Sequence, residues 1–228
     1  MTQTPLALIL EPEQLEAELG NENVVIVHIT KPERYAQFHV PGAVFVEGGR
    51  YVRADRPVYG LLPDESDFGR LLESLGINRD THVVAYDDEG GGWASRLLWT
   101  LEVAGHRSFS LLNGGLIAWV NEGFPVSQET VTAQTGSYEV HWQDKLVATA
   151  EYIRSRLTAD DVGLLDSRTP AEFSGTKAFA ARGGHIPGAR NVPWARAVNS
   201  DGTFKSAADL RQIYLEEQGL EEADEVVA

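Results

Sequence analysis

Two segments of this 228-residue chain are versions of one another. Residues 26–49 recur, with a longer loop, as residues 164–194. Each copy contains the turn His-x-Pro-Gly-Ala, at 39–43 in the first and at 185–189 in the second. A repeat of this length predicts two domains of the same architecture, each of about 110 to 120 residues, rather than one large domain.

Strands and helices are expected to alternate within each copy. Residues 24–29 and 83–86 are short runs rich in β-branched residues, as in the buried strands of parallel sheets. Hydrophobic spacing, Pro and Gly positions and an Asp64 cap predict the remaining elements of the first copy: helices at 12–20, 32–38, 64–76, 93–104 and 115–120, and strands at 43–46 and 109–112. The second copy repeats this order, with helices at 150–157 and 206–218 and strands at 162–166 and 189–192. This alternation predicts an α/β fold with parallel sheets.

A domain boundary is expected where hydrophobic periodicity is lost. Residues 123–137 contain Gly123, Pro125 and several Thr and Gln residues, which is typical of a linker. We therefore expect domains at 1–122 and at 138–228.

Charge and cysteine content exclude several classes of function. The formal charge of −15, from 34 acidic and 19 basic residues, argues against nucleic acid or an anionic membrane as a partner. The first residues have a short apolar run without a basic start, so no signal peptide or membrane span is expected and a cytoplasmic location is the default. The absence of cysteine excludes disulfides, zinc–thiolate sites and a cysteine nucleophile within these residues.

Several motifs together resemble those of the rhodanese family of sulfurtransferases. They are the repeated His-x-Pro-Gly-Ala turn after a strand end, the stretch 112–126 with Asn113-Gly114-Gly115 and Ala118-Trp119, and the tandem arrangement. The resemblance spans essentially the whole chain and implies two tandem rhodanese-like domains, each a parallel sheet flanked by helices. Residues 86–94 resemble in particular the first, catalytically silent domain of bacterial two-domain rhodaneses.

The resemblance implies a covalent reaction and no cofactor. In this family a cysteine thiolate, on a loop between a strand and a helix N-terminus, attacks the outer sulfur of an anionic donor such as thiosulfate. The sulfur is held as a persulfide and passed to a thiophilic acceptor such as cyanide. The corresponding residue of the first domain is Asp87, a carboxylate that cannot carry sulfane sulfur.

The repeat also predicts where the nucleophile belongs in the second domain. Residues 75–85 match residues 218–228, so Ala85 corresponds to Ala228 and Asp87 to a position two residues beyond it. We therefore expect the cysteine two residues after Ala228, a second domain truncated before its active-site loop, and no activity from these 228 residues alone.

Two other groups of residues have a functional and a structural interpretation. Asp87, Asp88 and Glu89 contain the carboxylates that divalent cations prefer, but consecutive residues of one turn point apart, which favours a solvated turn and no metal. His39 and His185 are candidate general bases, but their position before Pro-Gly favours hydrogen bonds that stabilise the turn.

Polar residues of the second copy lie where parallel sheets place ligands. Asp166 and Arg168 follow a strand end and are expected to brace the active-site loop, while Lys177 and Arg182 on the longer loop offer positive charge to an anionic donor or are solvated surface residues. Mercaptopyruvate-using relatives tend to have an arginine in place of Glu172, so its absence favours thiosulfate.

Three alternatives to a thiosulfate sulfurtransferase stay open at this point. One is a non-catalytic binding or regulatory module, in which neither domain has a nucleophile. The second is a 3-mercaptopyruvate sulfurtransferase. The third is a phosphatase or arsenate reductase on the same fold, which the tandem arrangement disfavours.

Overall fold

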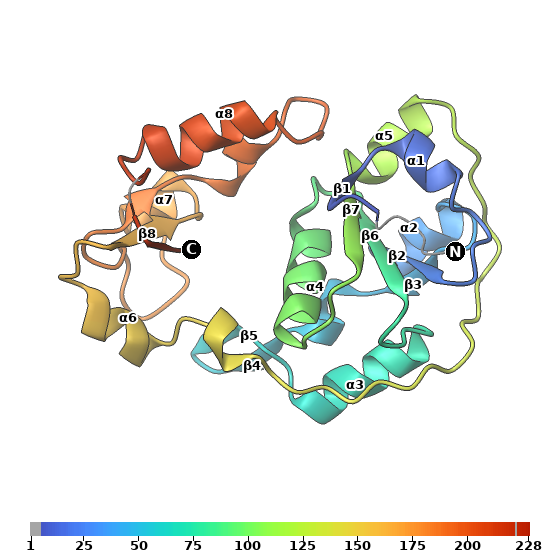
Figure 1. The fold of residues 1–228 in the computed structure, drawn as a ribbon, viewed down its shortest axis with the longest axis horizontal. Coiled ribbons are helices and arrows are strands. Elements are labelled where there is room, and N and C mark those ends of the chain that lie inside the picture. The colour runs from blue at the N-terminus through green and yellow to red at the C-terminus, as the bar shows by residue number, and fades with distance from the viewer. Residues whose placement is uncertain (1–5, 222) are drawn as a thin grey trace. The chain divides into compact units, whose positions relative to one another are not determined.

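The computed structural model describes residues 6–221 and 223–228, and the chain divides into two compact units (Figure 1). The first contains the residues up to Asp144 together with Asp201–Thr203, and the second contains Lys145–Ser200 and Phe204–Ala228. Among the described residues, no helix is long and apolar enough to cross a membrane.

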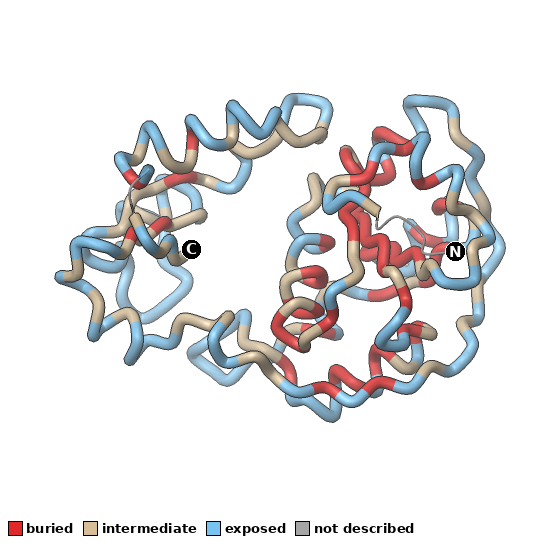
Figure 2. Tube along the Cα trace, viewed as in Figure 1, coloured by how far each residue is buried: buried red, intermediate tan, exposed pale blue. Residues whose placement is uncertain are grey.

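The first unit is built on a five-stranded parallel sheet in the order β1-β7-β6-β2-β3. Its central strands coincide with the two apolar runs singled out in the sequence. The strands are β1 (Ile9–Leu10), β2 (Val24–Ile29), β3 (Val44–Val46), β6 (His82–Asp87) and β7 (Phe109–Leu112). β2 and β6 are interior strands with a paired neighbour at each edge, and Figure 2 shows them as a largely buried part of the chain.

Helices cover both faces of this sheet (Figure 1). On one face Leu15, Leu116 and Trp119 pack with alternate residues of β2 and β6, such as Ile26 and Val84. On the other face α4 packs against β6 and β7. The helices are α1 (Pro12–Glu16), α2 (Pro32–Gln37), α3 (Glu65–Ser74), α4 (Gly92–Val103) and α5 (Gly115–Asn121).

Three details of the first unit differ from the sequence expectation. Helix α1 ends at Glu16, before the expected Gly20. Asp64 occupies the N-cap position of α3, but its side chain accepts no capping hydrogen bond and lies 3.9 Å from Arg53 instead. A 3-10 turn, η1 (Gly48–Tyr51), and a hairpin of β4 (Arg53–Asp55) and β5 (Val58–Leu61) were not expected, because the hairpin residues are largely exposed and lack a regular apolar pattern.

The second unit repeats the beginning of this architecture on a smaller scale. A three-stranded parallel sheet has the order β10-β8-β9, and the buried core around it consists of Leu165, Val192, Ile213 and Leu220. The expected helix at 206–218 is a short α-helix continued by a π-helical turn, and the expected strand at 189–192 is shorter. The elements are η2 (Asp144–Leu146) at the boundary, α6 (Ala150–Arg156), β8 (Val162–Asp166), α7 (Pro170–Phe173), β9 (Arg190–Asn191), η3 (Trp194–Ala197), α8 (Ala207–Arg211), η4 (Gln212–Glu216) and β10 (Glu225–Val227).

Strand pairing follows the same register in both units. Ile26 of β2 is paired with Val84 of β6, and the corresponding Leu164 of β8 is paired with Val227 of β10. On the other edge Val27 is paired with Val44, and the corresponding Leu165 is paired with Arg190. The sequence repeat is therefore a repeat of backbone hydrogen bonding as well.

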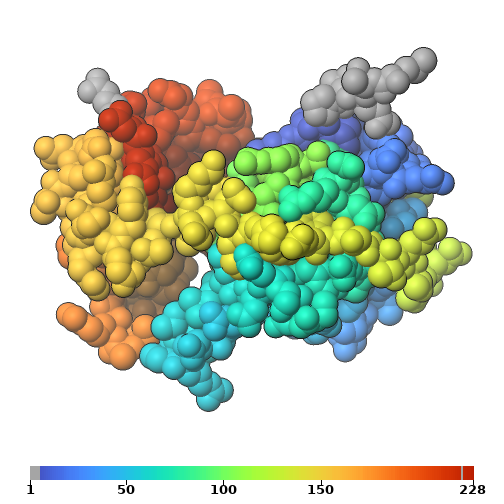
Figure 3. Space-filling model, turned by 60° about the horizontal axis from the view of Figure 1, so that its bottom comes forward, coloured from blue at the N-terminus to red at the C-terminus, as the bar shows by residue number. Residues whose placement is uncertain are grey.

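The segment after α5 belongs to the first unit as far as Asp144, beyond the expected domain start at 138. Tyr138 and Val140 are buried, Tyr138 hydroxyl lies 3.2 Å from His106 Nδ1, and Trp142 stacks on Phe68. Figure 3 shows this part of the chain, in yellow, lying across the green and cyan surface of the first unit. Isolated large side chains hold it there, so its attachment leaves no periodic pattern in the sequence.

Candidate functional site

The two His-x-Pro-Gly-Ala turns have the same structure. Nδ1 of His39 lies 2.8 Å from the Tyr35 carbonyl oxygen, and Nδ1 of His185 lies 2.8 Å from the Phe173 carbonyl oxygen. Each imidazole also stacks on the ring of that same residue, with centroids 3.8 and 3.6 Å apart. Gly42 and Gly188 take φ values of +79° and +85°, which a glycine adopts without strain. Both histidines therefore stabilise their turns, as the structural interpretation predicted.

Asp87 fills the loop between β6 and α4. Its Oδ1 accepts hydrogen bonds from the backbone N–H groups of Glu89 and Gly91, at 2.9 and 2.7 Å, and its Oδ2 accepts from those of Trp93 and Ala94, both at 3.0 Å. The residue is only 2% exposed. The negative carboxylate thus satisfies the free N–H groups at the helix N-terminus and the positive end of the helix dipole.

The acidic residues 87–89 were expected to form a solvated turn. This expectation is wrong for Asp87 and Asp88. Asp87 is buried as described, and Asp88 has a side chain only 9% exposed, accepts a 3.0 Å hydrogen bond from Thr30 and lies 3.5 Å from Arg34. Only Glu89 is exposed. The carboxylates of Asp87 and Asp88 have different partners, and no group of three or more potential ligand residues in the described part of the chain is placed to hold a metal ion.

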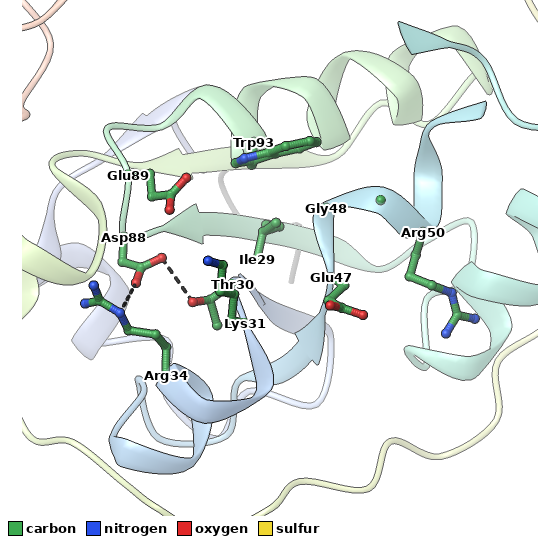
Figure 4. Close-up of a pocket in the computed structure, with 11 residues that line it drawn as sticks. Ile29, Thr30, Lys31, Arg34, Glu47, Gly48, Arg50, Asp88, Glu89 and Trp93 are labelled. Atoms are coloured by element: carbon green, nitrogen blue, oxygen red, sulfur yellow. Dashed lines mark hydrogen bonds and ion pairs between the residues drawn. The ribbon is translucent and has the colours of Figure 1, made fainter. Parts of the chain in front are cut away.

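A cavity of about 320 Å³ opens beside this loop (Figure 4). It lies where β2, β3 and β6 end, the edge at which open parallel sheets place ligands. Its wall combines both signs of charge with the exposed indole of Trp93. The lining residues are Ile29, Thr30, Lys31, Arg34, Glu47, Gly48, Gly49, Arg50, Asp88, Glu89 and Trp93. These residues come from three separate stretches of the chain, 29–34, 47–50 and 88–93, so no single sequence motif identifies the group.

His28 is a buried titratable group near the end of β2. Its side chain is fully buried, stacks on Tyr86 with centroids 4.4 Å apart, and neither ring nitrogen has a hydrogen-bond partner among the described residues. Burial lowers the pKa of His28 to about 4, against the opposing attraction of the Asp88 carboxylate. The imidazole is therefore neutral at pH 7. Burial also raises the pKa of Tyr51, whose hydroxyl donates to the Trp93 carbonyl oxygen at 2.9 Å.

In the second unit the structure brings Asp166 and Arg168 together at the end of β8. The guanidinium of Arg168 donates from Nε to both carboxylate oxygens, at 2.9 and 3.2 Å, and its backbone N–H donates to Oδ1 at 3.0 Å. The hydrogen bond from Arg168 lowers the pKa of Asp166. Arg168 Nη2 also donates to the Gly184 carbonyl oxygen at 2.9 Å, so the pair ties the strand end to the long loop.

Asn191 completes this arrangement, although it was not singled out in the sequence. Its side-chain amide donates to the carbonyl oxygens of Asp166 and Arg168, at 2.9 and 2.8 Å, and thereby fixes the backbone between them. It could have been recognised in the sequence by its position just after the repeated turn, on the strand beside β8. The corresponding residue of the first copy is Phe45, so this polar brace is specific to the second unit.

The remaining predicted residues of the second unit lie apart from that pair. Glu172 is part of a capping box and accepts hydrogen bonds from the Thr169 hydroxyl and backbone N–H, which lower its pKa. The amine of Lys177 lies 4.8 Å from the centroid of the Phe179 ring. Lys177 and Arg182 are exposed, and within the part of the chain that the structure describes neither has an ion pair within 4 Å.

Both units of the chain are similar to known proteins. The family model of the rhodanese-like domain matches residues 11–122 and again residues 149–228. The chain belongs to the rhodanese family. The expectation of two rhodanese-like α/β segments with parallel sheets is thereby confirmed.

Relatives of this rhodanese extend the comparison over nearly its whole length. It is 39% identical to a thiosulfate sulfurtransferase of Pseudomonas aeruginosa and 38% identical to one of Azotobacter vinelandii, each over 222 residues, which are 97% of this chain and 82% of the relative. The 3-mercaptopyruvate sulfotransferase SseA of Escherichia coli has a similar structure, with a TM-score of 0.82 at 25% identity, covering 92% of this chain and 83% of SseA. These relatives support a sulfurtransferase.

Proposed function

We propose that this rhodanese transfers sulfane sulfur from thiosulfate to a thiophilic acceptor, with its nucleophile in the second domain, two residues after Ala228. A cysteine thiolate there attacks the outer sulfur of thiosulfate, and the sulfur–sulfur bond breaks as sulfite leaves with the electron pair. The acceptor, for example cyanide, then attacks the outer sulfur of the persulfide. Thiocyanate forms and the thiolate is regenerated.

The shared register of the two sheets is the observation that carries this proposal. Ile29, the last residue of β2, is paired with Asp87, and Ser167 is the residue of the second copy that corresponds to Ile29. If β10 continued in its observed register, the second residue after Ala228 would lie beside Ser167, which supports the proposed position of the nucleophile. That position adjoins the Asp166–Arg168 pair, whose tie to the long loop would hold the active-site wall in place.

The choice of donor rests on Glu172 and on the names of the relatives. A substrate carboxylate such as that of 3-mercaptopyruvate is best held by a bidentate arginine, and a glutamate at this place repels it. The Glu172 carboxylate accepts the hydrogen bond of its capping box, so this position offers no positive charge to a substrate carboxylate. We therefore favour thiosulfate, in a protein that works in the cytoplasm without a cofactor.

The first domain is proposed to be silent in this reaction. Asp87 stands where the persulfide would form, and its carboxylate already accepts the four backbone N–H bonds that would stabilise a thiolate. Without a cysteine, residues 1–228 alone should not form thiocyanate.

The test is a thiocyanate assay with thiosulfate and cyanide on two chains. One has these 228 residues, and the other continues with the residues that the source organism encodes after Ala228. We expect turnover only from the longer chain, and its loss when the cysteine two residues after Ala228 is replaced by serine. An inactive longer chain that still binds a protein or small-molecule partner would support the alternative, a non-catalytic binding module. Turnover of 3-mercaptopyruvate in preference to thiosulfate would support the other sulfurtransferase.

A further inference from the structure

We propose that the cavity of the first domain binds a small zwitterion, an α-amino acid with an apolar side chain, without forming a covalent bond to it. This site is separate from the sulfur-transfer reaction proposed for the second domain. The cavity holds about 320 Å³, within the range of small-molecule sites, and lies at the ligand-binding edge of a parallel sheet.

The loop beside the cavity has four N–H groups around the N-terminus of α4 that are not free to bind an oxyanion. The N–H groups at the N-terminus of α4 would be the natural partners of thiosulfate or phosphate. The carboxylate of Asp87 already accepts hydrogen bonds from Trp93 and Ala94 at this terminus and from Glu89 and Gly91 before it. A second anion there would compete with Asp87 for the same donors and be repelled by its charge. These N–H groups are therefore not available to a ligand, and the charged side chains of the wall are its candidate partners.

The charged side chains of the wall are balanced in sign. Three are basic and three are acidic, so the lining has no net charge, although the chain as a whole carries −15. Arg34 and Asp88 lie 3.5 Å apart and neutralise one another. The other four charged residues of the wall have no ion-pair partner within 4 Å among the described residues; they are Lys31, Glu47, Arg50 and Glu89. A dipolar ligand satisfies both signs of charge at once, whereas a simple anion or cation satisfies one sign and is repelled by the other.

Trp93 gives the cavity its apolar and aromatic surface. Its indole is held over the backbone of Gly48, where an added Cβ would lie 2.5 Å from the ring, and the residue is still 42% exposed. Figure 4 shows the indole with Glu89 beside it and Lys31 on the opposite side of the space. An ammonium group is attracted by a carboxylate and by the face of an indole. We therefore place the ligand's ammonium by Glu89 and Trp93, its carboxylate by Lys31, and its side chain against the indole.

The experiment measures binding to the 228-residue chain by titration calorimetry, with methionine and phenylalanine as probes. Two analogues of methionine each lack one charge: 3-(methylthio)propylamine has no carboxylate, and 4-(methylthio)butanoate has no ammonium. We expect saturable binding of at least one amino acid at millimolar concentrations, and at least tenfold weaker binding of both analogues and of thiosulfate. Lys31→Gln and Glu89→Gln should each weaken amino-acid binding at least tenfold. Lys145→Gln, at an exposed lysine outside the cavity, should leave it unchanged.

Three outcomes would overturn the inference. They are the absence of saturable binding for both amino acids, thiosulfate binding as tight as that of the amino acids, and unchanged amino-acid affinity in Lys31→Gln. The substituted residues are exposed, so circular dichroism spectra matching the parent chain exclude unfolding as the cause of a loss. Because no step involves sulfur transfer, an inactive second domain leaves these results interpretable.

Discussion

Asp87 shows how one side chain can satisfy a helix N-terminus. Its carboxylate accepts hydrogen bonds from four backbone N–H groups, at the position where the proposed mechanism puts a cysteine thiolate in the second domain. Replacing Asp87 by alanine leaves buried donors without an acceptor, which costs about 2–4 kcal/mol of the free energy of unfolding. We expect Asp87→Ala to lower the urea midpoint of the first unit, and Asp87→Asn to lower it less.

The same substitution separates the roles of the two domains. In a longer, active chain, Asp87→Ala should leave thiosulfate turnover nearly unchanged at temperatures where the variant is folded. A large loss of turnover would contradict the assignment of a silent first domain.

His28 predicts a pH dependence of stability. Its folded pKa of about 4 lies below the unfolded value of 6.5, so between these values the unfolded chain binds more protons than the folded one. The free energy of unfolding should therefore fall as pH decreases through this window, by about 3 kcal/mol in total from His28, and be unaffected by it above pH 6.5. His28→Phe should remove this contribution and stabilise the protein at pH 7, because two buried nitrogens without partners are lost.

Urea unfolding at pH 7 and pH 5 measures both effects. The pH dependence that remains in His28→Phe is expected from His82 and His106, whose pKa values burial also lowers. His141→Gln, at an exposed histidine, is the control. An identical pH dependence in His28→Phe and the parent chain would refute the prediction.

At the scale of elements, η1 packs against α4 through Gly48, a position where a side chain would collide with the Trp93 ring. Gly48→Ala would place a Cβ 2.5 Å from the Trp93 ring, while Gly49→Ala meets no atom within 4 Å. We expect Gly48→Ala to destabilise the first unit by about 1–3 kcal/mol and to shift the indole Nε1–H resonance of Trp93, with Gly49→Ala close to the parent protein in both. Equal effects of the two substitutions would show that Trp93 does not pack as described.

The end of β8 depends in the same way on Arg168. In a longer, active chain, Arg168→Ala releases both Asp166 and the Gly184 carbonyl oxygen, and we expect thiosulfate turnover to fall about tenfold or the second unit to unfold at lower urea. Arg211→Ala removes a more exposed ion pair, with Glu216, away from this strand end and should change neither. Unaltered turnover and stability in Arg168→Ala would show that Asp166 and Arg168 do not support the active-site loop.

Elements with periodic apolar patterns were predictable, and those held by single contacts were not. Strand β2 was expected at the residues it occupies, and α4 within one residue at each end, because a buried strand and an amphipathic helix must both be apolar at regular spacing. The β4–β5 hairpin is exposed and has no such spacing. The cavity depends on which strand ends lie side by side, and no single segment contains that information. Asp87 could be singled out only because the repeat aligned it with the position proposed for the nucleophile.

On the scale of the whole molecule, the two units differ in how much apolar surface they bury. The first has a five-stranded sheet with helices on both faces, whereas four buried residues make the core cluster of the second. Backbone amides exchange when their hydrogen bonds open, and opening is easier where fewer side chains are packed around them. We expect the amides of β8 to exchange faster than those of β2 and β6 in hydrogen–deuterium exchange, and equal protection would contradict this difference in core size.

The placement of the nucleophile is tested most directly by mass spectrometry of the source protein after incubation with thiosulfate. Trypsin cleaves after Arg211, and no Lys or Arg follows up to Ala228, so one peptide carries β10 and the residues after it. We predict that this peptide contains a cysteine two residues beyond Ala228, gains one sulfur atom there, and loses it to cyanide. A source protein without that cysteine, or one that forms thiocyanate while this peptide stays unmodified, would contradict the proposed mechanism.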